Sequence, residues 1–276
     1  MNLNWQRVVT VARTDLKQLI QDKGFWMPMM ILGSIFFFFI PVILLFAVTR
    51  VQDAQIVEQL STTLKVLPAK AQSAMKGETE TAKASYALAV FLLAPVAVVV
   101  PLTISTAIGA ATLVGERERG TGEFLAHSPA DVKEIYLGKL IASLVPGYAT
   151  TLVGFGVYSL IVNLLVGPSV GGWFFPTTQW WVLMLWVVPP FLALTLSIVL
   201  RLSARVKSTA AAQQASGLVT LPLIMIAYSQ STGSLFGAER AGIWMGAIAW
   251  LIAGIALSRG MRAVSRARLL GVADGI

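Results

Sequence analysis

Long apolar runs constrain this chain more than any other feature of its sequence. Several of them approach or exceed about 20 residues, the length at which an α-helix spans the roughly 30 Å hydrocarbon core of a bilayer. Charged residues make up 12% of the chain, about half of the roughly 25% typical of a soluble domain. The predicted fold class is therefore an all-α polytopic integral membrane protein. Its six predicted transmembrane helices are Phe25–Val48, Tyr86–Val114, Ile135–Val166, Trp180–Leu200, the short Ala215–Tyr228 with Pro222 inside it, and Gly242–Leu257.

Lysine and arginine are divided unevenly between the two sides of this predicted bundle. Fifteen of the 21 basic residues fall in the N-terminal segment, the second and fourth loops and the C-terminal segment. Because basic residues accumulate in cytoplasmic loops, both termini are predicted to be cytoplasmic. The same rule accounts for the +8 net charge. Nucleic acid is not a predicted partner, since no long basic run with interleaved aromatic residues occurs.

The centres of the predicted spans carry no Asp, Glu, Lys, Arg or His. Ion-coupled carriers and proton pumps usually place such groups within the membrane, so any uphill transport is predicted to take its energy from a partner. Cysteine is absent and His127 is the single histidine, which predicts no metal site and a surface role for His127. Hydroxyl groups in the spans either line a pathway or serve helix packing: Thr103, Ser105, Thr106, Thr220 and Tyr228.

Two segments outside the spans have helical patterns. Residues 1–24 are predicted to be an amphipathic interfacial helix, which either only lies flat in the membrane interface or also contacts a cytosolic partner. Residues 49–83 are predicted to be an extracellular loop, either a helical cap or a flexible linker. The apolar positions behind these two predictions are Trp5, Val8, Val9, Ala12, Leu16, Leu19 and Ile20 in the first, and Val57, Leu60, Leu64 and Leu67 in the second.

The most unusual segment is 115–134, which reads GERERGTGEFLAHSPADVKE. It follows a second span that, as one uninterrupted helix of about 43 Å, would project beyond the hydrocarbon core into the cytosol. Glycines permit a sharp turn after four alternating charges, and Ser128 is a candidate N-cap for the next helix. Taken alone, the pattern is also that of an ordinary solvated loop.

This segment resembles the cytoplasmic signature of type-two ATP-binding-cassette (ABC) exporter permeases. The resemblance rests on Gly115–Thr121, Ser128-Pro129 and Leu137–Leu140, and Ala204–Lys207, Ala212–Gln214 and Leu221-Pro222 are similar to the fourth loop and fifth span of the same family. Gly122 departs from the pattern, where many members carry a larger residue. The resemblance implies that residues 115–134 couple the chain to an ATPase, through Glu116, Arg117, Glu118, Arg119, Gly120, Thr121, Phe124 and Leu125.

The same resemblance implies a single transmembrane permease domain over residues 1–276. It also implies a multi-pass protein of a prokaryotic plasma membrane, the cell inner membrane. The expected partners are a second permease subunit, identical or different, two ABC ATPase subunits that hold ATP and magnesium, membrane lipid and a substrate. Uncharged spans favour a lipid-like, amphipathic or hydrophobic small molecule as that substrate.

The chain itself is predicted to be neither an enzyme nor a cofactor-binding protein. Around Gly138-Lys139, the position of the first glycine of a phosphate-binding loop holds Lys133, and Leu140 replaces the Ser or Thr that follows the lysine. Two alternative functions stay open at this point. One is a membrane scaffold or assembly subunit regulated by an ATPase partner, and the other is an ATP-independent channel or carrier.

Overall fold

The computed structural model describes residues 3–51, 59–60, 62, 64–65, 69–118, 128–203, 210–211, 214, 217, 220 and 241–263, and all regular structure within these residues is helical. Five helical segments are long and apolar enough to cross a membrane: Lys23–Val51, Glu80–Thr112, Val132–Leu165, Thr178–Ser203 and Gly242–Met261. They confirm five of the six predicted spans to within a few residues. The remaining one, 215–228, lies almost entirely outside the described residues.

Each crossing segment is built from one or more helical elements. The first consists of α2 (Lys23–Ser34), η1 (Ile35–Phe39), α3 (Ile40–Phe46) and η2 (Ala47–Val51), and the second of α6 (Glu80–Ala87), η3 (Leu88–Leu92) and α7 (Val96–Glu118). The third is α9 (Val132–Leu165), the fourth is α10 (Thr178–Val182), η5 (Leu183–Val187) and α11 (Val188–Ser203), and the last is α13 (Ala241–Ala263). The other described elements are α1 (Trp5–Gln21), α5 (Ala69–Ser73) and η4 (Gly167–Ser169).

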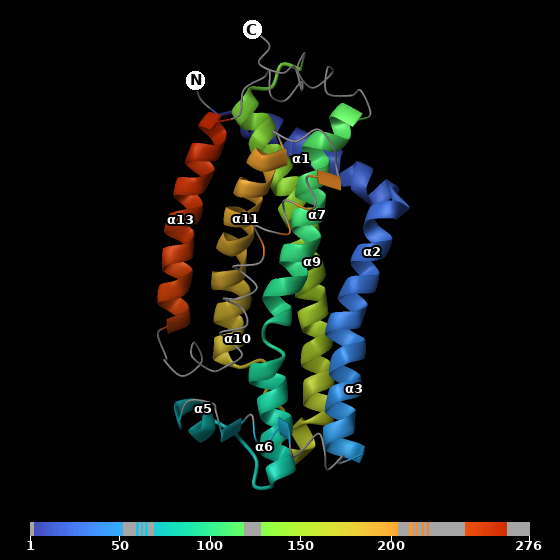
Figure 1. Ribbon diagram of the computed structural model, residues 1–276, viewed down its shortest axis with the longest axis vertical. Coiled ribbons are helices and arrows are strands. Elements are labelled where there is room, and N and C mark those ends of the chain that lie inside the picture. The colour runs from blue at the N-terminus through green and yellow to red at the C-terminus, as the bar shows by residue number, and fades with distance from the viewer. Residues whose placement is uncertain are drawn as a thin grey trace.

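The crossing segments stand side by side along the long axis, and α1 lies across one end of them (Figure 1). We call this the α1 end; α5 and α6 lie at the opposite end. Helices α11 and α13 run in the same direction, both toward the α1 end. The Trp186 indole donates to the Ile243 carbonyl at 3.0 Å near their starts, and Gly260, near the end of α13, faces Tyr136, which bonds to Ser197 of α11. Ser203 and Ala241 therefore lie at opposite ends of the bundle.

The centre of the bundle is formed by α7, α9 and α11. Small residues let these helices approach each other closely, as is common where helices pack in lipid. A Cβ on Gly109 of α7 would lie 2.8 Å from the Leu196 side chain of α11, and one on Gly147 of α9 would lie 2.9 Å from the Pro101 carbonyl of α7. Leu102, Leu192 and Leu196 are accordingly almost completely buried.

The second crossing segment is not one uninterrupted helix, which corrects the prediction from sequence. A turn at residues 93–95 separates η3 from α7. Pro95 has no backbone N–H and its ring clashes with the preceding helical turn, so the regular ladder cannot continue through it. The amide of Leu93 bonds to Leu88 and that of Ala94 to Phe91. The break lies nearer the end of the segment opposite α1.

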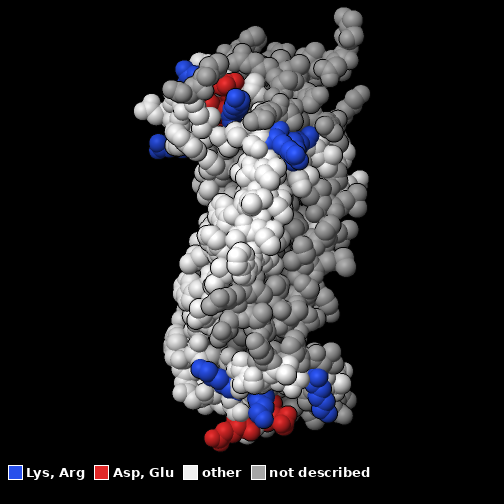
Figure 2. All heavy atoms as spheres, turned by 90° about the vertical axis from the view of Figure 1, so that its left-hand side faces the viewer, with Lys and Arg blue, Asp and Glu red and all other residues white. Residues whose placement is uncertain are grey.

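Charged side chains gather at the two ends of the molecule (Figure 2). The face in that view shows Lys, Arg, Asp and Glu at the top and bottom, with a broad belt of other described residues between them. Many large apolar side chains of the described residues are exposed, among them Phe39, Val153 and Leu251. An apolar surface of this kind, bounded by charge, is what a helical bundle presents to a bilayer.

Candidate functional site

The segment that the sequence singled out, 115–134, is described at its two ends. Its first residues form the last turn of α7, which ends at Glu118, and the description resumes at Ser128. Glu116, Arg117 and Glu118 therefore belong to a helix. The other predicted coupling residues, Arg119, Gly120, Thr121, Phe124 and Leu125, lie outside the described residues, and so does His127. The coupling role of all eight stays a prediction.

The next helix, α9, begins with a capping box. Asp131 is its N-cap, with extended backbone angles, and the Asp131 carboxylate accepts a hydrogen bond from the Val132 N–H at 2.7 Å. The Glu134 carboxylate reaches back and accepts from the Asp131 N–H at 2.9 Å. The predicted cap at Ser128 was wrong, because α9 begins three residues later than that cap requires. The reciprocal bonds of Asp131 and Glu134 satisfy N–H groups that the first turn leaves open.

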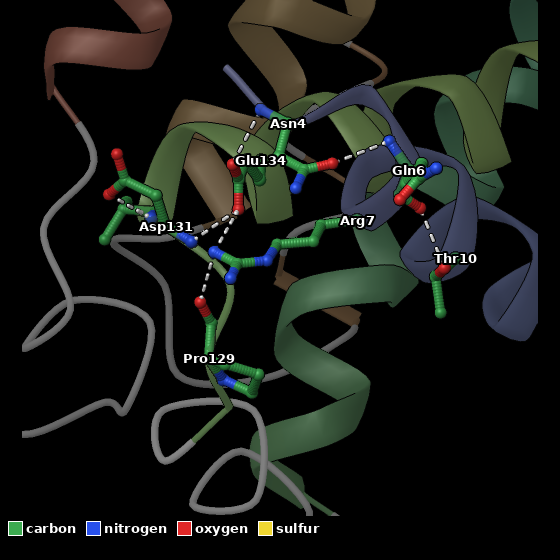
Figure 3. Close-up of polar contacts among 8 residues, drawn as sticks. Asn4, Gln6, Arg7, Thr10, Pro129, Asp131 and Glu134 are labelled. Atoms are coloured by element: carbon green, nitrogen blue, oxygen red, sulfur yellow. Dashed lines mark hydrogen bonds and ion pairs between the residues drawn. The ribbon is translucent and has the colours of Figure 1, made fainter. Parts of the chain in front are cut away.

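Glu134 also joins the start of α9 to the start of α1 (Figure 3). Its Oε1 accepts a hydrogen bond from the Asn4 backbone N–H at 2.9 Å, and its Oε2 lies 3.7 Å from the Arg7 guanidinium. Arg7 in turn donates to the Pro129 carbonyl at 2.8 Å. The Glu134 side chain is only 4% exposed, and a buried carboxylate is stable only with hydrogen-bond donors around it. The first turns of α1 and α9 are thus one polar unit.

Helix α1 crosses α9 at Gly138. A Cβ at this position would lie 2.7 Å from the Val11 side chain and 3.0 Å from the Val8 carbonyl oxygen of α1. The first distance is shorter than real Cβ atoms show and the second is tighter than most, so a larger residue would force α1 away from α9 at this point. Val8 is completely buried there. Gly138 belongs to the Leu137–Leu140 motif, and the structure gives it a packing role.

Lys139, the next residue, lies buried where three helices meet. Its side chain is 1% exposed, and its Nζ lies 3.3 Å from the Asp15 carboxylate of α1, whose side chain is 12% exposed. The same ammonium donates to the Thr112 carbonyl of α7 at 3.2 Å. Breaking a buried ion pair by removing one partner typically costs about 3–5 kcal/mol. Lys139 therefore connects α9, α1 and the last two turns of α7.

A small cavity lies beside this ion pair, between α1, α2 and α7. Its volume is about 70 Å³, enough for a few water molecules. Asp22, on its edge, already accepts a hydrogen bond from the Gly24 N–H at 2.9 Å. No group of three or more His, Cys, Asp or Glu side chains that could hold a metal ion occurs in the described part of the chain. The cavity is lined by Asp15, Gln18, Leu19, Asp22, Phe25, Ile108, Ala111 and Thr112.

The hydroxyl residues predicted as pathway candidates do not share one surface where they are described. Thr103 is exposed on α7, whereas Ser105, completely buried, faces Gly147 of α9. Thr106 and Thr220 are buried, and their hydroxyls donate within their own helices, to Leu102 and Gly217. Tyr228 lies outside the described residues. A pathway role for these residues stays a prediction, with Thr103 the one of the described four that is open to the surface.

Sequence reasoning missed the connection between α1 and α9. By sequence, Asp15 and Arg7 fall outside the apolar arc of the N-terminal helix, and Lys139 is one more basic residue beside a predicted span. One available signal was the position of Asp15, which at 100° per residue lies directly beside the apolar arc that contains Val8 and Leu19. The other was the Gly138-Lys139 pair, whose small residue and cation stand at the start of a long apolar helix.

A comparison with known proteins finds one family whose model matches most of this chain. The family model described as "ABC-2 family transporter protein" matches residues 9–239, which include most of α1, the first four crossing segments and the whole of segment 115–134. No curated protein matches the chain.

Proposed function

Because the chain belongs to the ABC-2 family of transporter proteins, we propose that it is the transmembrane permease subunit of an ATP-driven exporter. Permeases of this family are membrane transport components that normally work with ATP-binding-cassette subunits. In the proposal, two permease subunits form the translocation pathway, and two separate ATPase subunits bind ATP and magnesium on the cytoplasmic side. The family match over most of the chain is the observation that carries the proposal.

The proposed topology has six spans with both termini in the cytoplasm. The parallel course of α11 and α13 supports it, because Ser203 and Ala241 lie at opposite ends of the bundle, as an odd number of spans between them would require. One crossing, at the predicted span 215–228, satisfies this requirement. The excess of basic residues in the segments assigned to the α1 end supports a cytoplasmic location for that end.

We assign α1 to the cytoplasmic membrane interface. Helix α1 buries Val8 and Ala12 against the bundle, yet it leaves Trp5, Val9 and Ile20 exposed by 61%, 57% and 72%. These three side chains lie within about 60° of each other on the helix, since the repeat is about 100° per residue. An exposed apolar stripe beside a basic polar face is typical of a helix that lies in the headgroup region.

The proposed contact with the ATPase is the part of segment 115–134 that runs over residues 115–127, from the last turn of α7 toward the start of α9. Its two ends support this role, because Glu116 to Glu118 are helical and α9 starts from a firmly capped first turn. A segment can transmit motion only if both of its stems belong to rigid elements. The substrate is proposed to be lipid-like, amphipathic or hydrophobic, since the described residues of the belt between the charged ends form no ion pair that could bind a charged solute.

Reconstitution with an ATPase subunit tests the proposal. The partner is chosen as a soluble protein with a phosphate-binding loop that is encoded beside this chain. The pair is coexpressed, purified and placed in proteoliposomes, and ATP hydrolysis is measured with and without the permease. A mass spectrum of the intact complex identifies copurified lipid or other ligands, which then serve as transport substrates. We expect a stable complex, and ATP hydrolysis that rises when the copurified ligand is added.

Three results would argue against an exporter. Ligand movement that persists without ATP would indicate a channel or carrier. A stable complex that hydrolyses ATP at a rate independent of every copurified ligand, and moves none of them, would indicate a scaffold or assembly subunit. Failure of the chain to bind any ATPase encoded beside it would remove the partner on which the proposal depends.

A further inference from the structure

Helix α1 is linked to the chain on both sides of segment 115–127, directly on the C-terminal side and through Lys139 of α9 on the N-terminal side. On the C-terminal side, Arg7 donates to the carbonyl of Pro129, two residues beyond the segment, at 2.8 Å. On the N-terminal side, Asp15 holds Lys139 at 3.3 Å, and Lys139 donates to the carbonyl of Thr112 at 3.2 Å. The stem before α9 is therefore attached to α1 directly, and the stem at the end of α7 is attached to α1 through Lys139.

The geometry of α1 sets the separation of these two attachments. Arg7 and Asp15 are eight residues apart on one helix, a distance of about 12 Å along its axis. Between them, Val8 and Val11 pack directly on Gly138 of α9, so α1 cannot slide along α9 without a clash. Its position is also determined by Glu134, which accepts the Asn4 N–H at 2.9 Å.

We propose that α1 acts as a clamp on the stems of segment 115–127, with Arg7, Asp15 and Lys139 as positioning residues for coupling. The coupling role rests on the proposed function, whereas the clamp rests on the contacts of Arg7, Asp15 and Lys139. The clamp keeps the end of α7 and the start of α9 at a constant separation, so a force applied to the segment moves α7, α9 and α1 together. Without it, the segment would bend at its stems and the force would be lost there.

The two attachments differ in their surroundings, and this difference predicts the size of each effect. Lys139 is 1% exposed, so its removal leaves the mostly buried Asp15 carboxylate without this cation and takes away the side-chain link to the Thr112 carbonyl. Arg7 is 48% exposed, so water can replace its guanidinium at Pro129. Loss of Lys139 is therefore expected to have the larger effect.

Amide hydrogen exchange on the full chain in lipid nanodiscs tests the clamp. The variants are Lys139→Met and Arg7→Met, and the matched controls are Lys133→Met and Arg13→Met, exposed residues of the same two helices. We expect Lys139→Met to speed exchange at residues 113–118 by about tenfold or more. Arg7→Met should speed exchange at residues 130–135 by a smaller factor, and residues 245–258 of α13 should be unchanged in both variants.

Two outcomes would overturn the clamp. One is exchange at both stems that equals that of the controls. The other is an increase spread over the whole bundle, α13 included, which would show only a general loss of stability. If Lys139→Met fails to insert, Asp15→Asn replaces it, because this change keeps the Thr112 contact while it weakens the charge pair. Asp15→Asn should then speed exchange in the last turn of α1, and unchanged exchange there would overturn the clamp.

Stimulated ATP hydrolysis in the reconstituted complex tests the positioning role. Variants with fast-exchanging stems should still bind the ATPase subunit but lose most of the stimulation by the copurified ligand, whereas the two controls keep it. Full stimulation in Lys139→Met would overturn the positioning role. The proposed function would be unaffected by that result, because the wild-type complex would still be stimulated. Absence of stimulation in the wild-type complex would instead count against the proposed function, and the exchange result would be unaffected by it.

Discussion

The side-chain hydroxyl of Tyr158, in α9, donates a hydrogen bond to the backbone carbonyl of Ala89, in η3. This carbonyl loses its helical partner at the break in the second crossing segment, because the Leu93 amide bonds to Leu88 instead. The next carbonyl, that of Val90, accepts from the Trp180 indole at 3.0 Å. Tyr158 and Trp180, whose rings stack at 5.3 Å, thus satisfy the backbone groups that Pro95 leaves open, as is required of a broken helix in lipid.

Tyr158→Phe is expected to destabilise the protein by about 0.5–2 kcal/mol, since it leaves the buried Ala89 carbonyl without a donor while the ring packing is kept. The measurement is the unfolding midpoint in detergent. The matched control is Ser159→Ala, which removes the neighbouring hydroxyl, whose bond to the Phe175 carbonyl is long at 3.4 Å. Equal midpoints for wild type and Tyr158→Phe would show that the hydroxyl is dispensable at the break.

Two glycines of α9 should respond to alanine with opposite signs. A Cβ on Gly154 would meet the Phe37 ring of η1, whereas one on Gly156 would meet nothing within 4 Å. Gly154→Ala is therefore expected to cost about 1–3 kcal/mol through overpacking. Gly156→Ala should be neutral or stabilise by up to about 1 kcal/mol, because alanine is the better helix former. The measurement is the thermal unfolding midpoint of both variants. A clear decrease for both, or for neither, would contradict the packing of η1 on α9.

The proposed orientation predicts opposite labelling of two single-cysteine variants, in a chain that has no cysteine of its own. Ser73→Cys, in α5, should react with an impermeant maleimide added to intact cells. Lys17→Cys, on the exposed side of α1, should react only after the membrane is opened, and Ser265→Cys near the C-terminus should behave like it. The reverse pattern would invert the topology and remove the α1 end from the cytosol.

Glu116→Ala and Arg119→Ala test the proposed coupling segment. As an exposed pair on one helix face they would contribute only about 0.2–0.5 kcal/mol, but burial against an ATPase raises the cost of losing one partner to about 2–5 kcal/mol. We expect transport and transport-coupled ATP hydrolysis to fall about tenfold or more. Expression, insertion and the basal activity of the isolated ATPase should be unchanged. Wild-type rates in proteoliposomes would identify the segment as an ordinary loop.

The number and bounds of the described spans could be predicted from the sequence because they depend on local quantities. A run of about 20 apolar residues spans the bilayer wherever it occurs, and five of the six predicted runs correspond to helices of that kind. The signature at 115–134 is also local, and the family match includes it. The break at Pro95 was equally local, and the prediction missed it by treating a long apolar run as one helix.

The burial of Lys139 and Glu134 was decided by the tertiary structure. Their partners on α1 are Asp15, 124 positions from Lys139, and Asn4, 130 positions from Glu134. The Gly138-Lys139 pair and the position of Asp15 are local signals of a close approach, but they do not identify the partner that lies more than a hundred positions away. The sequence also does not show which face of a span packs on other helices and which face contacts lipid. Lipid and neighbouring helices are equally apolar, so the hydrophobic effect does not distinguish the two faces. On α9, Gly154 is buried and Gly156 is exposed. Only the packing of η1 on one side of that helix determines which of the two glycines can accept a methyl group.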